Sequence, residues 1–168
     1  RGLDAFFKSL TPEHFHALLE QDLGHVRRLD ELTSAAPERA ARRAALATAP
    51  ELLAHITAGH LRSPALAAIV LGVLTRSAQF VKCARGASLL PRLFAHSLYQ
   101  AEPKLGACLE LAEWAGGRQD LEAPLFAAAD CITATGTDAT LAAIRPRVPA
   151  AARFLAYGHR VSFAYVAA

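Results

Sequence analysis

The sequence contains no methionine and little lysine. Lysine occurs only at Lys8, Lys82 and Lys104, whereas arginine is common. A complete gene product begins with methionine, so a chain that begins at Arg1 is expected to be either a processed piece or a fragment. No signal-peptide pattern stands at its start to explain processing, which favours the fragment.

Cysteine and long apolar runs are also scarce. The three cysteines, Cys83, Cys108 and Cys131, are too few and too isolated to form a disulfide framework, which predicts a reducing, cytoplasmic setting. The longest apolar run, Ala65–Leu74, is about half as long as the roughly 20 residues that a helix needs to span a bilayer. We therefore expect no transmembrane segment.

Charge of either sign is modest. The chain has 18 basic and 15 acidic residues, a net charge of +3, and its 53% of hydrophobic residues excludes intrinsic disorder. The dense basic group is Arg39, Arg42 and Arg43, which would share one face of a helix and could contact a phosphate or an acidic partner. A solvated helix face is the favoured interpretation, so we expect no nucleic-acid partner.

Several motifs of known chemistry are missing as well. The sequence has no GxxxxGK[ST], GxGxxG, GxSxG, HExxH or CxxC pattern, which argues against a P-loop, a standard dinucleotide fingerprint, a serine hydrolase elbow and common zinc sites. His14 and His16 lie two positions apart and cannot converge on one metal from a helix. No metal site is expected.

The first 49 residues have a helical pattern. Thr11-Pro12-Glu13 is typical of a helix start, and Gly24 is typical of the following end. Further helical segments are expected over His25–Leu32 and after Pro37. The sequence therefore predicts an N-terminal helical segment over residues 1–49.

After Pro50, short apolar strands alternate with helices. Strands are expected over 52–57, 80–83, 107–112, 131–134, 153–156 and 161–166, and helices over 65–74, 88–98, 121–126 and 137–144. The helix over 65–74 is apolar all round, which predicts burial. The alternation predicts an α/β domain over residues 50–168, with a doubly wound, mostly parallel sheet and helices on both faces.

Polar residues follow several of these expected strands. The segment His55–His60 follows the first strand, Lys82 and Arg85 follow the second, and Gly136-Thr137-Asp138 opens a helix whose N–H groups would suit a phosphate. Each signal is weak by itself. Because ligands of such sheets bind where the strands end, their common edge predicts a binding site.

These segments together resemble a known family. The matching stretches are Thr57-Ala58-Gly59, Ser63-Pro64-Ala65-Leu66, Phe80-Val81-Lys82, Leu90–Ala95, Ala134–Leu141 and Arg153–Phe163. They resemble the acyl-CoA reductase branch of the aldehyde dehydrogenase superfamily and are similar to the long-chain fatty-acyl reductases of bacterial bioluminescence. The resemblance implies that residues 50–168 form a dinucleotide-binding domain, incomplete relative to the full-length enzyme.

The resemblance also implies a cofactor and its contacts. A lysine at the place of Lys82 contacts the adenosine ribose, and Gly136 and Thr137 match the turn that faces the pyrophosphate. Arg85 stands where NAD-dependent members carry a glutamate that bonds the ribose 2′-hydroxyl. A guanidinium pairs with a 2′-phosphate instead, so NADP(H) is favoured over NAD(H).

The first turn departs from the family pattern. Thr57 and Ala58 are assigned to the cofactor site, but His60 replaces the asparagine that donates to the oxyanion of the substrate. His60 is the candidate for that catalytic contact, with different geometry and charge. The residues before Gly158, Leu155-Ala156-Tyr157, also lack the usual basic glutamate, which suits a reductase.

The nucleophilic cysteine of the family would come after residue 168. Cys83, Cys108 and Cys131 lie in or at the ends of apolar strands, which favours a structural role for each. The expected function is the cofactor-binding part of an enzyme that reduces a long-chain acyl-CoA or acyl-protein thioester to a fatty aldehyde with NADPH. The alternative is a degenerate, non-catalytic scaffold or interaction subunit. A homo-oligomer or other acyl-transfer subunits are further expected partners.

Overall fold

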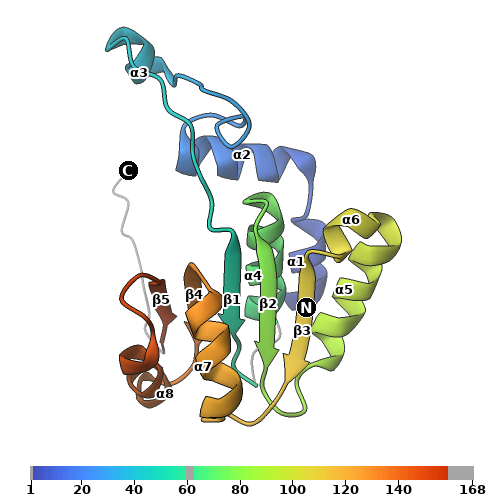
Figure 1. Ribbon diagram of the computed structural model, residues 1–168. Helices are drawn as coiled ribbons and strands as arrows, with labels where there is room; N and C mark the ends of the chain where they lie inside the picture. Colours follow the sequence, from blue (N-terminus) through green and yellow to red (C-terminus); the bar gives the residue numbers. More distant parts are fainter. Residues whose placement is uncertain (1, 60–62, 159–168) are drawn as a thin grey trace, which may run out of the picture.

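A five-stranded parallel sheet forms the centre of the protein. The computed structural model describes residues 2–59 and 63–158 (Figure 1). The strands are β1 (Leu52–Ile56), β2 (Ala78–Cys83), β3 (Leu109–Glu113), β4 (Cys131–Thr135) and β5 (Arg153–Tyr157), in the spatial order β3-β2-β1-β4-β5. Every pairing is parallel, so the prediction of a mostly parallel α/β sheet is confirmed.

Helices cover both faces of the sheet, as predicted for a doubly wound fold. They are α4 (Ser63–Leu74), α5 (Leu89–Ala101), α6 (Pro103–Gly106), α7 (Gln119–Ala128) and α8 (Asp138–Ile144), with a 3-10 turn, η1 (Arg145–Arg147), after α8. The chain runs through α4 and α5 while it builds β1, β2 and β3, and through α7 and α8 while it adds β4 and β5. The two halves therefore place their helices on opposite faces.

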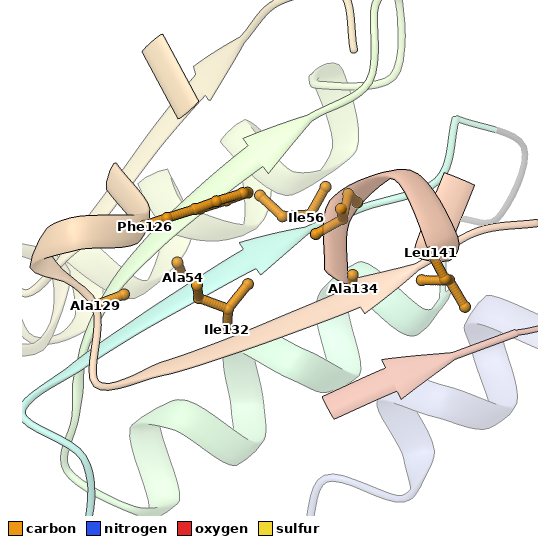
Figure 2. Packing of buried hydrophobic residues seen from close by; sticks show 8 residues of the cluster. Ala54, Ile56, Phe126, Ala129, Ile132, Ala134 and Leu141 are labelled. Carbon is orange, nitrogen blue, oxygen red and sulfur yellow. The ribbon is translucent and has the colours of Figure 1, made fainter. Parts of the chain in front are cut away.

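The face under α7 and α8 holds the larger core cluster. Figure 2 shows Phe126 of α7 near Ala54 of β1, with Ile132 of the adjacent strand β4 in the same cluster. Phe126 is 1% exposed, and Ala54 and Ile132 are fully buried. Burial of an aromatic or branched side chain of this kind contributes about 1.5–3 kcal/mol, so this layer is a main source of stability.

The opposite face is only partly covered. Ile69 of α4 packs with Val81 and Cys83 of β2 in a second cluster that extends to α5. Leu71 of α4, however, remains 49% exposed. The predicted burial of helix 65–74 therefore holds for Ala65, Leu66 and Ile69 but not for Leu71.

Three helices precede the sheet, of which the first two are α1 (Gly2–Lys8) and α2 (Pro12–Leu23). The Thr11 side chain accepts a hydrogen bond from the backbone N–H of His14, and Gly24 ends α2 with φ of 78°. Both ends of this helix are as the sequence predicts. The helix α1 contacts α4, and Phe7 lies 6.1 Å from Phe94 of α5 between ring centroids.

The expected helices after Gly24 are largely wrong. Residues 25–32 form turns, and α3 (Ala36–Ala40) is a short helix. An ion pair between Arg28 and Glu38, together with a bridge between Thr33 and Ala45, folds this segment on itself. These contacts join residues distant in sequence, so local periodicity does not reveal them.

The proposed basic helix face is also wrong. The helix α3 ends at Ala40, before two of the three arginines, and Arg42 has a left-handed backbone with φ of 53°. Arg39, Arg42 and Arg43 consequently do not share a helix face. The expected strand 161–166 lies outside the described residues. No helix within 2–59 and 63–158 has both the length and the apolar character needed to cross a lipid bilayer.

Candidate functional site

A cavity of about 570 Å³ opens at the carboxyl ends of β1, β2 and β4. The strand order reverses between β1 and β4, since β1 continues to β2 on one side while the later half of the chain adds β4 on the other. This position is the topological switch point, where open α/β sheets bind their ligands. We call this cavity the switch-point cleft.

Five of the predicted site residues line the switch-point cleft. They are Thr57, Ala58, Lys82, Gly136 and Thr137. The sheet register explains this convergence, because Ile56 at the end of β1 pairs with Lys82 on one side and with Ala134 on the other. Segments that are far apart in sequence are thus brought to one edge.

Two predicted residues are not placed in this cleft. His60 lies outside the described residues. Arg85 lies in the turn after β2, where it is exposed and does not line the cleft. That turn is fixed by Glu113, which accepts hydrogen bonds from the Gly86 N–H at 2.8 Å and from the Ser88 hydroxyl at 2.5 Å. Arg85 directly follows Ala84, which lines the cleft, so Arg85 stands at the rim.

The first turn is fastened to the second strand by Thr57. Its backbone N–H and its hydroxyl both donate to the carbonyl oxygen of Lys82, at 3.1 Å and 3.3 Å. This double contact aligns the ends of β1 and β2. Because the Thr57 hydroxyl donates its proton to the backbone, the role of Thr57 is to fix the shape of the cleft.

Lys82 places a buried cation in the cleft. It is 4% exposed and lies on the face of the sheet that α7 covers. Burial lowers the pKa of Lys82, and the negative charge of Glu122 partly opposes that change. A desolvated ammonium of this kind interacts more strongly with an anionic ligand than a surface lysine does.

The turn before α8 supplies the opposite side of the cleft. The Thr137 side chain caps α8 by accepting a hydrogen bond from the Thr140 N–H at 3.2 Å. A Cβ at Gly136 would lie 3.3 Å from the Thr140 side chain, so a larger residue would crowd this turn. Gly136 keeps the backbone accessible from the cleft.

Several lining residues are not predicted from the sequence as part of the site, and four of them bear on its chemistry. Gly116 and Gly117 lie before α7, where a Cβ would meet no atom within 4 Å, so space for a ligand is open there. Glu122 and Arg147 also line the cleft and form an ion pair at 2.5 Å. The Gly-Gly turn was visible in the sequence, but its place in the cleft depends on the sheet order.

A second cavity, of about 830 Å³, lies on the opposite face of the sheet, between α4 and the uncovered β4 and β5. Leu71 of α4, Leu155 and Tyr157 of β5 and Thr133 of β4 line it. His55 forms part of its floor, with Nδ1 at 2.7 Å from the Thr133 hydroxyl and Nε2 at 3.1 Å from Oε1 of Gln79. The predicted polar character of His55 thus belongs to this face, away from the switch-point cleft.

His55 makes the stability of the protein depend on pH. Burial lowers the pKa of His55 below its ordinary value of 6.5. Below pH 6.5 the unfolded chain binds the proton more readily than the folded chain, so the free energy of unfolding falls as the pH drops until the folded pKa is passed. We expect the loss of stability from pH 7.5 to pH 5.5, measured by urea unfolding, to be smaller in His55→Gln than in the wild type. An equal loss in both proteins would contradict this role.

The three cysteines are free. Cys83 and Cys131 are buried, and burial raises the pKa of both thiols, which suits the predicted structural role. Cys108 is exposed and directly precedes β3, so the strand expected over 107–112 begins later and Cys108 is not buried as its predicted structural role implies. None of the three lines the switch-point cleft.

Among the described residues, no group of three or more His, Cys, Asp or Glu side chains is arranged to hold a metal ion.

A parallel, doubly wound sheet with a cleft at its switch point defines the class of α/β proteins that bind ligands beyond the carboxyl ends of the strands. The family comparison is more specific: the model described as "Acyl-CoA reductase (LuxC)" matches residues 1–168. The chain belongs to the LuxC family of acyl-CoA reductases. A comparison with curated protein sequences gives no match.

Proposed function

We propose that the switch-point cleft binds NADP(H), and that the chain is the cofactor-binding part of an oxidoreductase that converts a long-chain acyl thioester into a fatty aldehyde. The observation that carries this proposal is the buried Lys82 ammonium in a cleft at the switch point of a LuxC-family chain. Gly116 and Gly117 line this cleft, and the space beside them is open to a ligand. The acyl group would come from acyl-CoA or from an acylated protein.

The proposed contacts follow the geometry of the cleft. Lys82 would hold the adenosine ribose, and Gly136 and Thr137 would face the pyrophosphate. Arg85 at the rim would pair with the 2′-phosphate, which favours NADP(H) over NAD(H). Within the described part of the chain no carboxylate is paired with Arg85, so its guanidinium is available for this contact.

In the proposed reaction, a cysteine from outside these 168 residues attacks the acyl-CoA carbonyl and releases the CoA thiol. Hydride addition to the resulting thioester carbon, loss of the cysteine thiolate and protonation of that thiolate give the aldehyde. When bound, NADPH supplies the hydride. His60 would face the reacting carbonyl as a hydrogen-bond donor. The free Cys83, Cys108 and Cys131 are not assigned to this step.

The proposal also covers organisation and setting. Residues 50–168 would form the dinucleotide-binding unit, and residues 1–49 a helical segment attached to it. The unpaired state of all three cysteines supports a reducing, cytoplasmic setting. A second copy of the chain or other acyl-transfer subunits would be its partners.

A titration of the chain with NADPH, followed by nucleotide fluorescence, tests the proposed function. We expect saturable binding that Lys82→Ala weakens by about tenfold to a hundredfold, the range for loss of a contact to a charged group. Lys104→Ala is the matched control, since Lys104 is an exposed lysine of α6 outside the cleft. A folded chain that binds no NADPH would support the alternative of a non-catalytic family member, and equal binding by wild type and Lys82→Ala would refute the site.

A further inference from the structure

Glu122 is a buried acid in the wall of the switch-point cleft. It lies in the first turn of α7, is 3% exposed and lines the cleft together with Lys82. A carboxylate at this depth requires partners, because an uncompensated buried charge is costly. Its surroundings therefore indicate what it does.

The two carboxylate oxygens of Glu122 have different partners. Oε1 accepts a hydrogen bond from the Gly117 N–H at 3.3 Å, across the turn that opens α7. Oε2 accepts from Nη1 of Arg147 at 2.5 Å. Glu122 thus connects the α7 side of the cleft with η1, the segment that follows α8.

Arg147 is itself held in place by further contacts. Its Nε donates to the carbonyl oxygen of Ala143 at 3.2 Å, and its guanidinium lies 5.7 Å from the centre of the Phe126 ring. Arg147 keeps the negative charge of Glu122 partly neutralised from one side. The remaining field of that charge acts on the interior of the cleft.

Lys82 is the other cation that this field reaches. No carboxylate forms a salt bridge with Lys82 among the residues the structure describes. The groups that favour its charged form are Glu122 from α7 and the neighbouring Cys83 of β2, whereas burial disfavours that form and lowers the pKa. Lys82, Glu122 and Arg147 thus line one cleft, where Glu122 is paired with Arg147 and its charge also acts on Lys82.

We propose that Glu122 is a positioning residue that acts through Lys82. The negative charge of Glu122 balances the buried Lys82 ammonium, which receives an anionic ligand. The ion pair between Glu122 and Arg147 determines how strongly the charge of Glu122 acts on Lys82. The inference rests on the proposed function, since Lys82 is the residue that would hold the cofactor and Glu122 would adjust the charge of Lys82. It also makes a prediction about Lys82 in the absence of any nucleotide.

The two members of the ion pair give the proposal its sharpest test. Glu122→Gln removes the negative charge and preserves the side-chain shape, so the titration of Lys82 moves to lower pH. Arg147→Gln removes the shielding cation, so the same titration moves to higher pH. If the pair were merely structural, breaking it from either side would have the same effect.

The titration is followed by NMR of the lysine side-chain carbons in the nucleotide-free chain. The sequence contains only Lys8 and Lys104 besides Lys82, and these exposed lysines serve as internal references. Asp120→Asn is the matched control, because Asp120 is in the same turn of α7 but pairs with Arg118 at the surface. We expect it to leave the Lys82 midpoint unchanged.

Binding of NADPH across the alkaline range supplies the second measurement. The pH at which binding weakens is expected to follow the Lys82 midpoint, downward in Glu122→Gln and upward in Arg147→Gln. An unchanged Lys82 midpoint in Glu122→Gln, or shifts of the same sign in both variants, would overturn the proposal. If the wild type bound no NADPH, the proposed function would fail, and the lysine titration would still decide the role of Glu122.

Discussion

Phe126→Ala is expected to reduce the free energy of unfolding by about 3–5 kcal/mol, the usual loss when a fully buried aromatic side chain is removed. Phe126 is 1% exposed and belongs to the larger core cluster, together with residues of β1 and β4 (Figure 2). It also supports the guanidinium of Arg147. Domains of this size are stable by about 5–15 kcal/mol, so the variant loses a large share of its stability. Urea unfolding followed by circular dichroism measures the change.

Leu121→Ala is the control for this prediction. Leu121 lies on the same helix, α7, but is 38% exposed. Its truncation removes less buried surface and leaves no enclosed cavity, so a loss of about 1 kcal/mol or less is expected. Equal losses in the two variants would mean that Phe126 is not the centre of the core.

Arg85→Glu is expected to reverse the cofactor preference. The substitution replaces a guanidinium at the rim of the switch-point cleft with a carboxylate, which repels a 2′-phosphate and accepts a hydrogen bond from a 2′-hydroxyl. We expect the ratio of NADPH to NADH affinity to fall by about a hundredfold, since like charges brought together cost several kcal/mol. Parallel titrations with the two nucleotides measure this ratio.

Arg39→Glu makes the same change of charge on the N-terminal segment and serves as the control. Arg39 is exposed on α3, away from the cleft. The ratio of NADPH to NADH affinity of Arg39→Glu should match that of the wild type. If Arg85→Glu also matched the wild type, the 2′-phosphate contact would have to be assigned to a different cation.

Local patterns predicted most of the fold after Pro50. Short apolar segments bounded by Gly, Pro and charged residues correspond to strands such as β1 and β4, and the Thr137 cap marks the start of α8. The helix expected over 25–32 does not form because this segment is held by the ion pair of Arg28 with Glu38. Such a contact between separate segments leaves no periodic signal in the sequence.

The sequence predicts those site residues that directly follow expected strands. Lys82 and Gly136 follow strands and converge because the sheet is parallel. Glu122 gave no such signal, since a single acid in the first turn of a helix is ordinarily a surface residue that favours the helix dipole. Its burial follows from the position of α7 over β1, which only the three-dimensional arrangement reveals.

The central place of β1 in the sheet has a consequence for how the protein is made. One edge of β1 pairs with β2, the next strand in the chain, and the other edge pairs with β4. The N–H of Leu52 in β1 donates a hydrogen bond to the carboxylate of Asp130, which lies 78 positions later. During synthesis on the ribosome, that edge of β1 stays open until β4 has emerged. The half-made sheet therefore exposes an apolar, unpaired strand, and the closing of β4 against β1 is the event that ends its vulnerability to aggregation.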